Sequence, residues 1–129
     1  MISGLIRKDS FIMHNFRELE TWKRSNQFAI MIYKLTESFP PKERYNLISQ
    51  MNRASVSISS NIAEGCSRSS VKDLTRFLDI SLGSSFELES QLQIAKGLNY
   101  ISNGKLKTII TELHQIQKMI QGFRQYINK

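Results

Sequence analysis

Apolar side chains recur every three or four residues along most of this chain, which is the period of an amphipathic helix. The pattern predicts four helices, over residues 16–39, 41–64, 70–97 and about 105–127. No stretch shows the two-residue alternation of a strand. Residues 1–15 have no clear period, and we expect them to form a partly flexible N-terminal arm. The sequence therefore predicts an all-α fold in which residues 16–129 form one antiparallel up-down-up-down four-helix bundle.

Proline, glycine and serine mark where these helices should begin and end. Pro40 and Pro41 should end the first helix, because proline donates no backbone hydrogen bond and restricts the residue before it. Pro41 should then occupy the first turn of the second helix. Gly65 should end that helix in the left-handed conformation. The expected N-caps of the third and fourth helices are Ser70, and Ser102 or Asn103.

The second helix is rich in serine, a residue that favours helices poorly. Such a helix persists when small residues permit close packing or when its polar groups are paired. Residues 82–85 of the third helix form a matching window of small side chains. We expect a polar network between the two helices in which Arg53 meets Glu87 or Gln91, since buried charges need partners. Its members would be Gln50, Arg53, Asn61, Glu64, Glu87 and Gln91.

No group of residues has catalytic or metal-binding spacing. Glu64 and Glu87 could be paired carboxylates, but the Glu-x-x-His partners of a di-metal bundle site are missing. His14 and His114 have no cysteine or carboxylate at ligand spacing. Cys66 follows a helix C-terminus, where the dipole does not favour a thiolate. We therefore expect no enzymatic activity, no catalytic or metal site and no cofactor.

The charge of the chain carries more information about function. Lys and Arg number 18 against 11 Asp and Glu, which gives a formal net charge of +7. This excess favours a polyanionic partner, although it also suits a surface that is only solubilising. Arg68, Lys72 and Arg76 recur at intervals of four residues and would form a stripe that can follow phosphates. Lys105, Lys107, Lys118 and Arg124 could form a second basic face. The candidate nucleic-acid-binding residues are therefore Arg68, Lys72, Arg76, Lys105, Lys107, Lys118 and Arg124.

Aromatic residues are more numerous than one narrow core needs. They include Trp22, Phe28, Tyr33, Phe77, Phe86, Tyr100, Phe123 and Tyr126. Exposed aromatic side chains often mark association surfaces, so we expect some of these residues to form a subunit interface.

The expected location is the cytoplasm. No apolar run approaches the length of a transmembrane helix. The first residues lack the apolar core of a secretory signal and soon carry charges. A single cysteine excludes an internal disulfide framework.

The two central helices also carry recognisable motifs. The second contains Arg53-Ala-x-x-Ser57-Ile-x-x-Asn61-Ile-Ala-Glu64-Gly65, and the third contains Gly83-Ser84-x-x-Glu87-Leu. Further matching elements are Trp22, Ile32-Tyr33-x-Leu-Thr-x-x-Phe39-Pro40, Glu43-x-Tyr45-x-Leu47-x-x-Gln50 and Leu98-x-Tyr100-Ile. Over residues 16–101 the chain resembles the four-helix-bundle proteins named after the open reading frame in the 23S rRNA intervening sequence, often labelled ribosomal-protein-like. It is also similar to the accessory variability protein of diversity-generating retroelements.

This resemblance implies a left-handed up-down bundle and a ring-shaped homo-oligomer, with a pentamer as the expected number. The retroelement relatives act as basic partners of a reverse transcriptase and its RNA. Residue Ser81 stands where the family usually has alanine, and the fourth helix matches by pattern alone. Fold does not settle function, and the ribosomal label does not imply membership of the ribosome.

Two functions follow as hypotheses. The first is a non-enzymatic, basic homo-oligomer that binds nucleic acid, structured RNA above all, by electrostatic contacts. The alternative is a protein-interaction scaffold that docks a partner protein, such as a reverse transcriptase, with no direct role in RNA binding. Binding of RNA should weaken with salt and depend on Lys and Arg, whereas a protein interface should tolerate salt and depend on exposed aromatic residues.

Overall fold

The computed structural model describes residues 15–129, so all of the expected arm except Asn15 lies outside the described residues. The elements in chain order are the short 3-10 helix η1 (Phe16–Glu18), α1 (Glu20–Thr36), the 3-10 turn η2 (Pro41–Glu43), α2 (Leu47–Cys66), α3 (Val71–Gly97) and α4 (Asn103–Ile127). Within this part of the chain the fold is all-α, with four α-helices and no strand, as the apolar period predicted.

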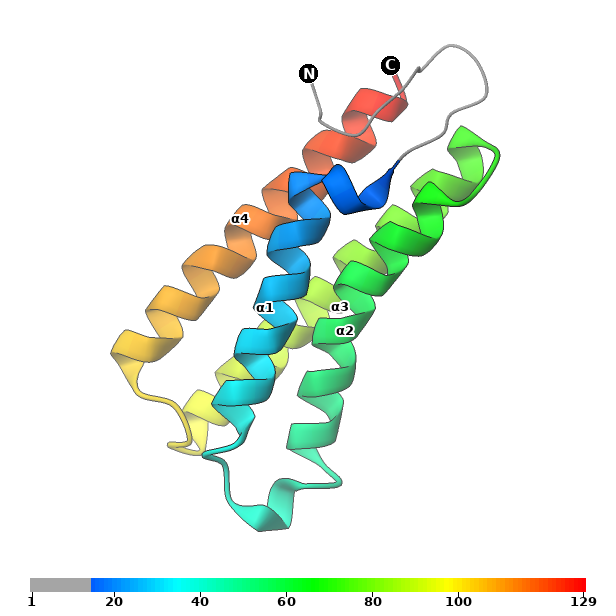
Figure 1. The fold of residues 1–129 in the computed structure, drawn as a ribbon. Helices are drawn as coiled ribbons and strands as arrows, with labels where there is room; N and C mark the ends of the chain where they lie inside the picture. The colour runs from blue at the N-terminus through cyan, green and yellow to red at the C-terminus, as the bar shows by residue number, and fades with distance from the viewer. Residues whose placement is uncertain (1–14) are drawn as a thin grey trace.

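The four helices pack side by side around one core (Figure 1). Helix α2 packs against both α1 and α3, and α4 packs against α3 and, less extensively, α1. The start of α1, the α2–α3 connection and the end of α4 lie at one end of the bundle, and η2 and the α3–α4 connection lie at the other. Each helix contributes fully buried side chains, such as Ile32, Ile58, Leu88 and Ile120. Burying each of them stabilises the fold by about 1.5–3 kcal/mol.

The first connection differs from the prediction. Helix α1 ends at Thr36, and Pro41 lies in η2 rather than in the first turn of α2, which begins at Leu47. The turn is held by a distant residue, because the hydroxyl of Tyr100 donates to Glu43 Oε2 at 2.8 Å. The ring of Tyr100 also lies 5.2 Å from that of Phe39, which is buried beyond the end of α1. These contacts stabilise a compact turn where proline spacing alone indicated a helix.

Gly65 does not end α2 in a left-handed conformation, as the sequence had led us to expect. It lies inside the helix, which continues to Cys66. A Cβ atom at Gly65 would be only 2.9 Å from Leu74 Cδ1 and from Phe77 Cβ. Glycine is needed here because α2 and the start of α3 approach so closely.

The expected caps of the later helices are confirmed. Ser70 Oγ accepts a hydrogen bond from the backbone of Asp73 at 3.1 Å, and Ser102 Oγ accepts one from Lys105 at 3.2 Å. Asn99, just beyond α3, takes the left-handed conformation, with φ of 64°. The backbone N–H of Tyr100 donates to Ala95 at 2.9 Å, which completes a Schellman motif there.

Helices α2 and α3 meet along a seam of small polar residues, as the serine-rich pattern predicted. The hydroxyls of Ser57 and Ser84 are 2.7 Å apart. Ser81 donates to the backbone carbonyl of Ile58, also at 2.7 Å, and is fully buried. Gly83, in the same small-residue window, faces no neighbour within 4 Å of its Cβ position. Close approach therefore depends on the serines and on Gly65.

None of the helices between residues 15 and 129 has both the length and the apolar character needed to cross a lipid bilayer.

Candidate nucleic-acid interface

Two of the seven candidate basic residues are paired with carboxylates. Arg68 contacts Glu64 Oε2 at 2.7 Å, one turn before it in the chain. Arg124 contacts Asp79 Oδ1 at 2.7 Å and so links α4 to α3, and this contact raises the pKa of Arg124. Exposed ion pairs contribute little to stability. They do neutralise part of the positive charge that these two residues offer to a partner.

Phe77 organises the stripe that the sequence predicted at the start of α3. The guanidinium groups of Arg68 and Arg76 lie 4.7 and 4.5 Å from the centre of its ring, as cation–π contacts. Lys72, between them in the sequence, is exposed. The structure thus brings Arg68 and Arg76 together over one buried ring.

The remaining candidates lie along α4. Lys105 and Lys107 are exposed in its first turns, at the opposite end of the bundle from the Phe77 stripe. Lys105 and Arg124 are roughly 28 Å apart along the helix axis, at about 1.5 Å per residue. Lys118 is exposed between them. The residues at the start of α4 are therefore separate from the stripe at the start of α3, and Lys118 and Arg124 lie further along α4.

Four residues of the expected polar network, Asn61, Glu64, Glu87 and Gln91, are bonded in separate pairs. Asn61 donates to the Ser57 hydroxyl at 2.9 Å, Glu64 pairs with Arg68, and Gln91 lies 3.4 Å from Glu87. The expected contact of Arg53 with Glu87 or Gln91 has no counterpart in the structure. Arg53 is exposed, as are Gln50, Glu64 and Glu87, so its charge stays in water and needs no partner.

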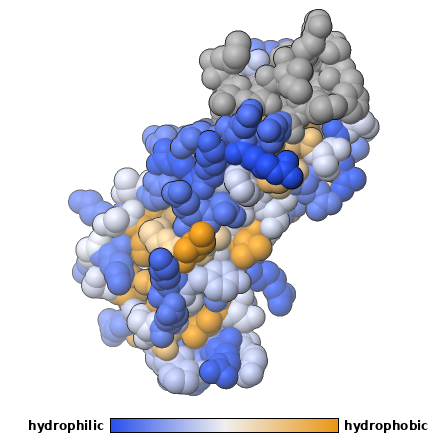
Figure 2. All heavy atoms as spheres, viewed as in Figure 1, coloured by the Kyte–Doolittle hydropathy of each residue, from blue (hydrophilic) through white to orange (hydrophobic). Residues whose placement is uncertain are grey.

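Sequence reasoning missed a grooved surface that crosses α1. One hollow of about 510 Å³ is lined by residues that include Tyr33, Arg44, Tyr45 and Arg53. A second, of about 390 Å³, shares Tyr33 with the first and adds Lys34. Figure 2 shows hydrophobic and polar surface interleaved over the lower half of the face that α1 crosses. Tyr33 is among the aromatic residues that exceed the needs of one core, and this surplus was the signal available in the sequence.

A third hollow, of about 480 Å³, lies between α1 and α4 and shares Lys34 with the second. Met31, Leu35 and Ile109 provide apolar lining, and Lys105 is also part of its wall. Further along the same seam, Arg24 binds Glu112 through two contacts of 3.0 and 2.6 Å. The hydrogen bond to Glu112 raises the pKa of Arg24. This ion pair joins α1 to α4 where their packing is otherwise sparse.

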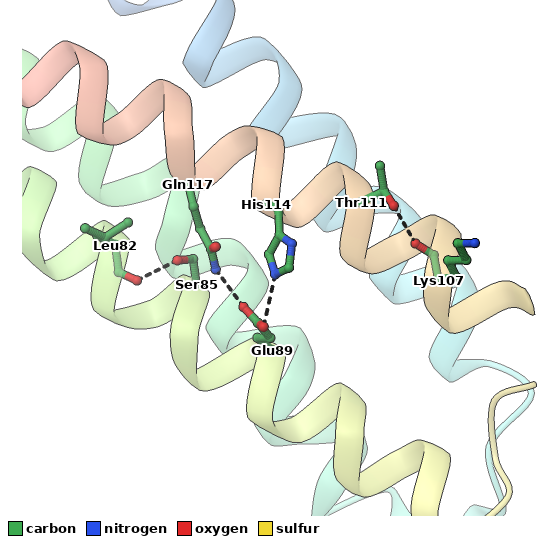
Figure 3. A network of polar contacts seen from close by, with 7 residues as sticks. All are labelled: Leu82, Ser85, Glu89, Lys107, Thr111, His114 and Gln117. Carbon is green, nitrogen blue, oxygen red and sulfur yellow. Dashed lines mark hydrogen bonds and ion pairs between the residues drawn. The ribbon is translucent and has the colours of Figure 1, made fainter. Parts of the chain in front are cut away.

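A second polar cluster joins α3 to α4 (Figure 3). Gln117 donates to Glu89 Oε1 at 3.0 Å, and the His114 ring nitrogen Nε2 lies 3.1 Å from Glu89 Oε2. These contacts hold the pKa of Glu89 below its ordinary value, with the Gln117 hydrogen bond as the largest cause and the His114 bond next. The histidine that the sequence left without a role therefore has a structural one. Within residues 15–129 no cluster of three or more His, Cys, Asp or Glu could hold a metal ion.

We expect replacement of Glu89 by glutamine to change how the free energy of unfolding depends on pH in the acidic range. Because the pKa of Glu89 is lowered by folding, its contribution is present above pH 4.5 and is lost as the pH falls through the lower, folded value. Above pH 5 the substitution should lower the free energy of unfolding by about 1 kcal/mol or less. The resulting difference in melting temperature between wild type and Glu89→Gln should shrink as the pH falls from 5 to 3. Glu37→Gln, at an exposed site, is the control. Parallel curves for wild type and Glu89→Gln would contradict the assignment.

Comparison with known proteins identifies a family and a solved structure that are similar to this chain. A model of the 23S rRNA-intervening sequence protein family matches residues 17–122. The chain is also similar to a crystal structure of a protein of unknown function from the S23 ribosomal protein family of Bacteroides thetaiotaomicron. That similarity has a TM-score of 0.76 and 24% sequence identity, and covers 81% of this chain and 95% of the other. At this identity it supports the fold alone. The comparison with curated proteins gives no significant match.

Proposed function

Since the chain belongs to the 23S rRNA-intervening sequence protein family, we propose that it is a basic, non-enzymatic, homo-oligomeric bundle that binds structured RNA by electrostatic contacts. The observation that carries the proposal is the unpaired positive charge. The net charge is +7. Five candidate residues make no ion pair with any residue between 15 and 129, and they are Lys72, Arg76, Lys105, Lys107 and Lys118. Such residues are free to contact phosphates.

The outer face of α3 supports the homo-oligomeric part of the proposal. Ile80, Ile94 and Leu98 recur at intervals of 14 and 4 residues, so they lie on one side of the helix. Each is between 41% and 52% exposed. A stripe of this kind favours burial against another surface. A ring, taken as a pentamer, would carry five times the charge of one chain and bind RNA more tightly through many weak contacts.

The proposal also includes the topology and handedness of the bundle and the cellular location of the protein. Packing of each helix against the next in the chain supports an up-down-up-down bundle. The family resemblance implies that this bundle is left-handed. The lone cysteine supports a cytoplasmic location, where disulfides are rare.

The test is light-scattering mass of the purified protein, alone and with an RNA hairpin, at low and high salt. We expect a multimeric mass and co-elution with RNA that is lost as salt increases. A monomeric mass at micromolar concentration would contradict the oligomer. A ring that does not bind RNA would favour the alternative, a scaffold that docks a partner protein.

Substitution of five residues by alanine should weaken RNA binding by at least tenfold and flatten its dependence on salt. The residues are Arg68, Lys72, Arg76, Lys105 and Lys107. Each phosphate contact that is removed reduces the slope of log affinity against log salt by roughly 0.7–0.9. Arg68 and Arg76 also contact Phe77, so a melting curve must show that the variant is folded. Unchanged binding by the folded variant would show that these residues do not form the interface.

A further inference from the structure

The three hollows described above adjoin one another across α1. The hollow beside η2 and the one between α1 and α2 share Tyr33 and Val56. The second and the third, between α1 and α4, share Lys34. Together they form a single surface, which we call the α1 groove. It begins at Arg44 and Tyr45 and ends at Lys105.

The lining of the α1 groove is positive and has no acidic residue in any of its three hollows. Its cations are Lys34, Arg44, Arg53 and Lys105. None of the four makes an ion pair within the described residues 15–129. The charge of the groove is therefore not neutralised by its own walls.

Two exposed tyrosines lie among these cations. Tyr45 is 85% exposed and Tyr33 is 49% exposed. Tyr45 lies between η2 and α2, in a turn that hydrogen bonds from Arg44 to Pro41 and from Asn46 to Glu43 hold at 3.1 and 3.0 Å. Its backbone is thus fixed while its ring is left in water. Aromatic rings displayed in this way among Arg and Lys are the usual elements of a surface that stacks unpaired bases.

We propose that the α1 groove binds a single-stranded segment of RNA, such as the loop of a hairpin. Bases stack on Tyr45 and Tyr33, and the phosphates lie beside Arg44, Arg53 and Lys34. A second copy of this chain fits the groove less well, because it would bring its own net charge of +7 against four unpaired cations. The inference rests on the proposed function and adds the form of RNA and the place where it binds.

The experiment compares two fluorescently labelled probes, a 12-nucleotide oligouridine and a blunt 12-base-pair RNA duplex. Fluorescence anisotropy gives the affinity of wild type, Tyr45→Ala and Tyr45→Phe for each. Tyr45→Ala should weaken oligouridine binding by about 5- to 150-fold, the range expected for losing one stacked base. Tyr45→Phe keeps the ring and should change it by less than about twofold. Both variants should bind the duplex as wild type does, since a paired base cannot stack on the ring.

Each other outcome has a definite meaning. If wild type binds neither probe, the proposed function itself is wrong. If wild type binds RNA and Tyr45→Ala keeps full affinity for oligouridine, RNA binding stands and the groove assignment is overturned. An equal loss for both probes would also overturn base stacking. Tyr45→Ala that lowers the mass of the oligomer and leaves RNA affinity unchanged would show that the groove is an interface between copies.

Discussion

Replacement of Gly65 by alanine is expected to destabilise the protein by about 1–3 kcal/mol, the usual effect of overfilling a packed interior. The new methyl group would lie 2.9 Å from both Leu74 Cδ1 and Phe77 Cβ. The leucine methyl could move, but Phe77 Cβ is fixed to the backbone of α3, so the two helices would have to separate. Alanine favours a helix by up to about 1 kcal/mol over glycine, which offsets only part of this loss.

Gly122→Ala is the matched control, since Gly122 lies in α4 with nothing within 4 Å of its Cβ position. There alanine should stabilise the protein by about 0.5–1 kcal/mol, through helix propensity alone. Chemical denaturation of the two variants and wild type gives both changes. The close approach of α2 and α3 would prove unimportant if Gly65→Ala were as stable as Gly122→Ala.

The thiol of Cys66 should react with iodoacetamide about a thousandfold more slowly than an exposed cysteine at pH 8. Burial raises the pKa of Cys66 from 9.0 to about 12. Only the thiolate is nucleophilic, so three pH units correspond to about a thousandfold less reactive species. The comparison is the Cys66→Ala, Ser69→Cys variant, whose thiol would occupy an exposed position next to α3. Similar rates for the two proteins would show that Cys66 is accessible.

The raised pKa of Cys66 also affects the stability of the protein at high pH. In the unfolded chain the thiol ionises near pH 9, whereas in the folded protein it stays neutral until about pH 12. The unfolded state therefore gains stability by losing this proton first, and the free energy of unfolding should decrease as the pH rises from 9 towards 12. Cys66→Ala should show less of this decrease.

Much of the fold could be predicted from the sequence because its signals are local. The four helices follow from apolar spacing, and the caps Ser70 and Ser102 follow from the residues beside them. The errors arose where a distant residue decides the outcome. Pro41 lies outside α2, in a turn that Tyr100 contacts through its hydrogen bond to Glu43. Gly65 is a packing residue because Phe77 faces it, yet a glycine in that position of a sequence is also typical of a helix end.

The arrangement of the candidate interface was predictable only in part. Sequence spacing indicated that Arg68, Lys72 and Arg76 lie together, and the structure places Arg68 and Arg76 over the same ring. The predicted up-down-up-down topology also places the start of α4, with Lys105 and Lys107, at the opposite end of the bundle from the start of α3. Arg53 was expected inside, since it lies near apolar positions of α2. The helix turns it outwards, towards the groove that α1 and α2 form together.

The ion pair between Arg24 and Glu112 has a consequence for how the chain assembles. It joins residues separated by 88 positions, whereas α2 and α3 are connected by the short segment 67–70. Closing a long loop costs more entropy than closing a short one, and local contacts form sooner. The α2–α3 hairpin, with its serine seam, is therefore favoured as the early folding unit. We expect the seam between α1 and α4 to close last, when both ends of the chain have docked.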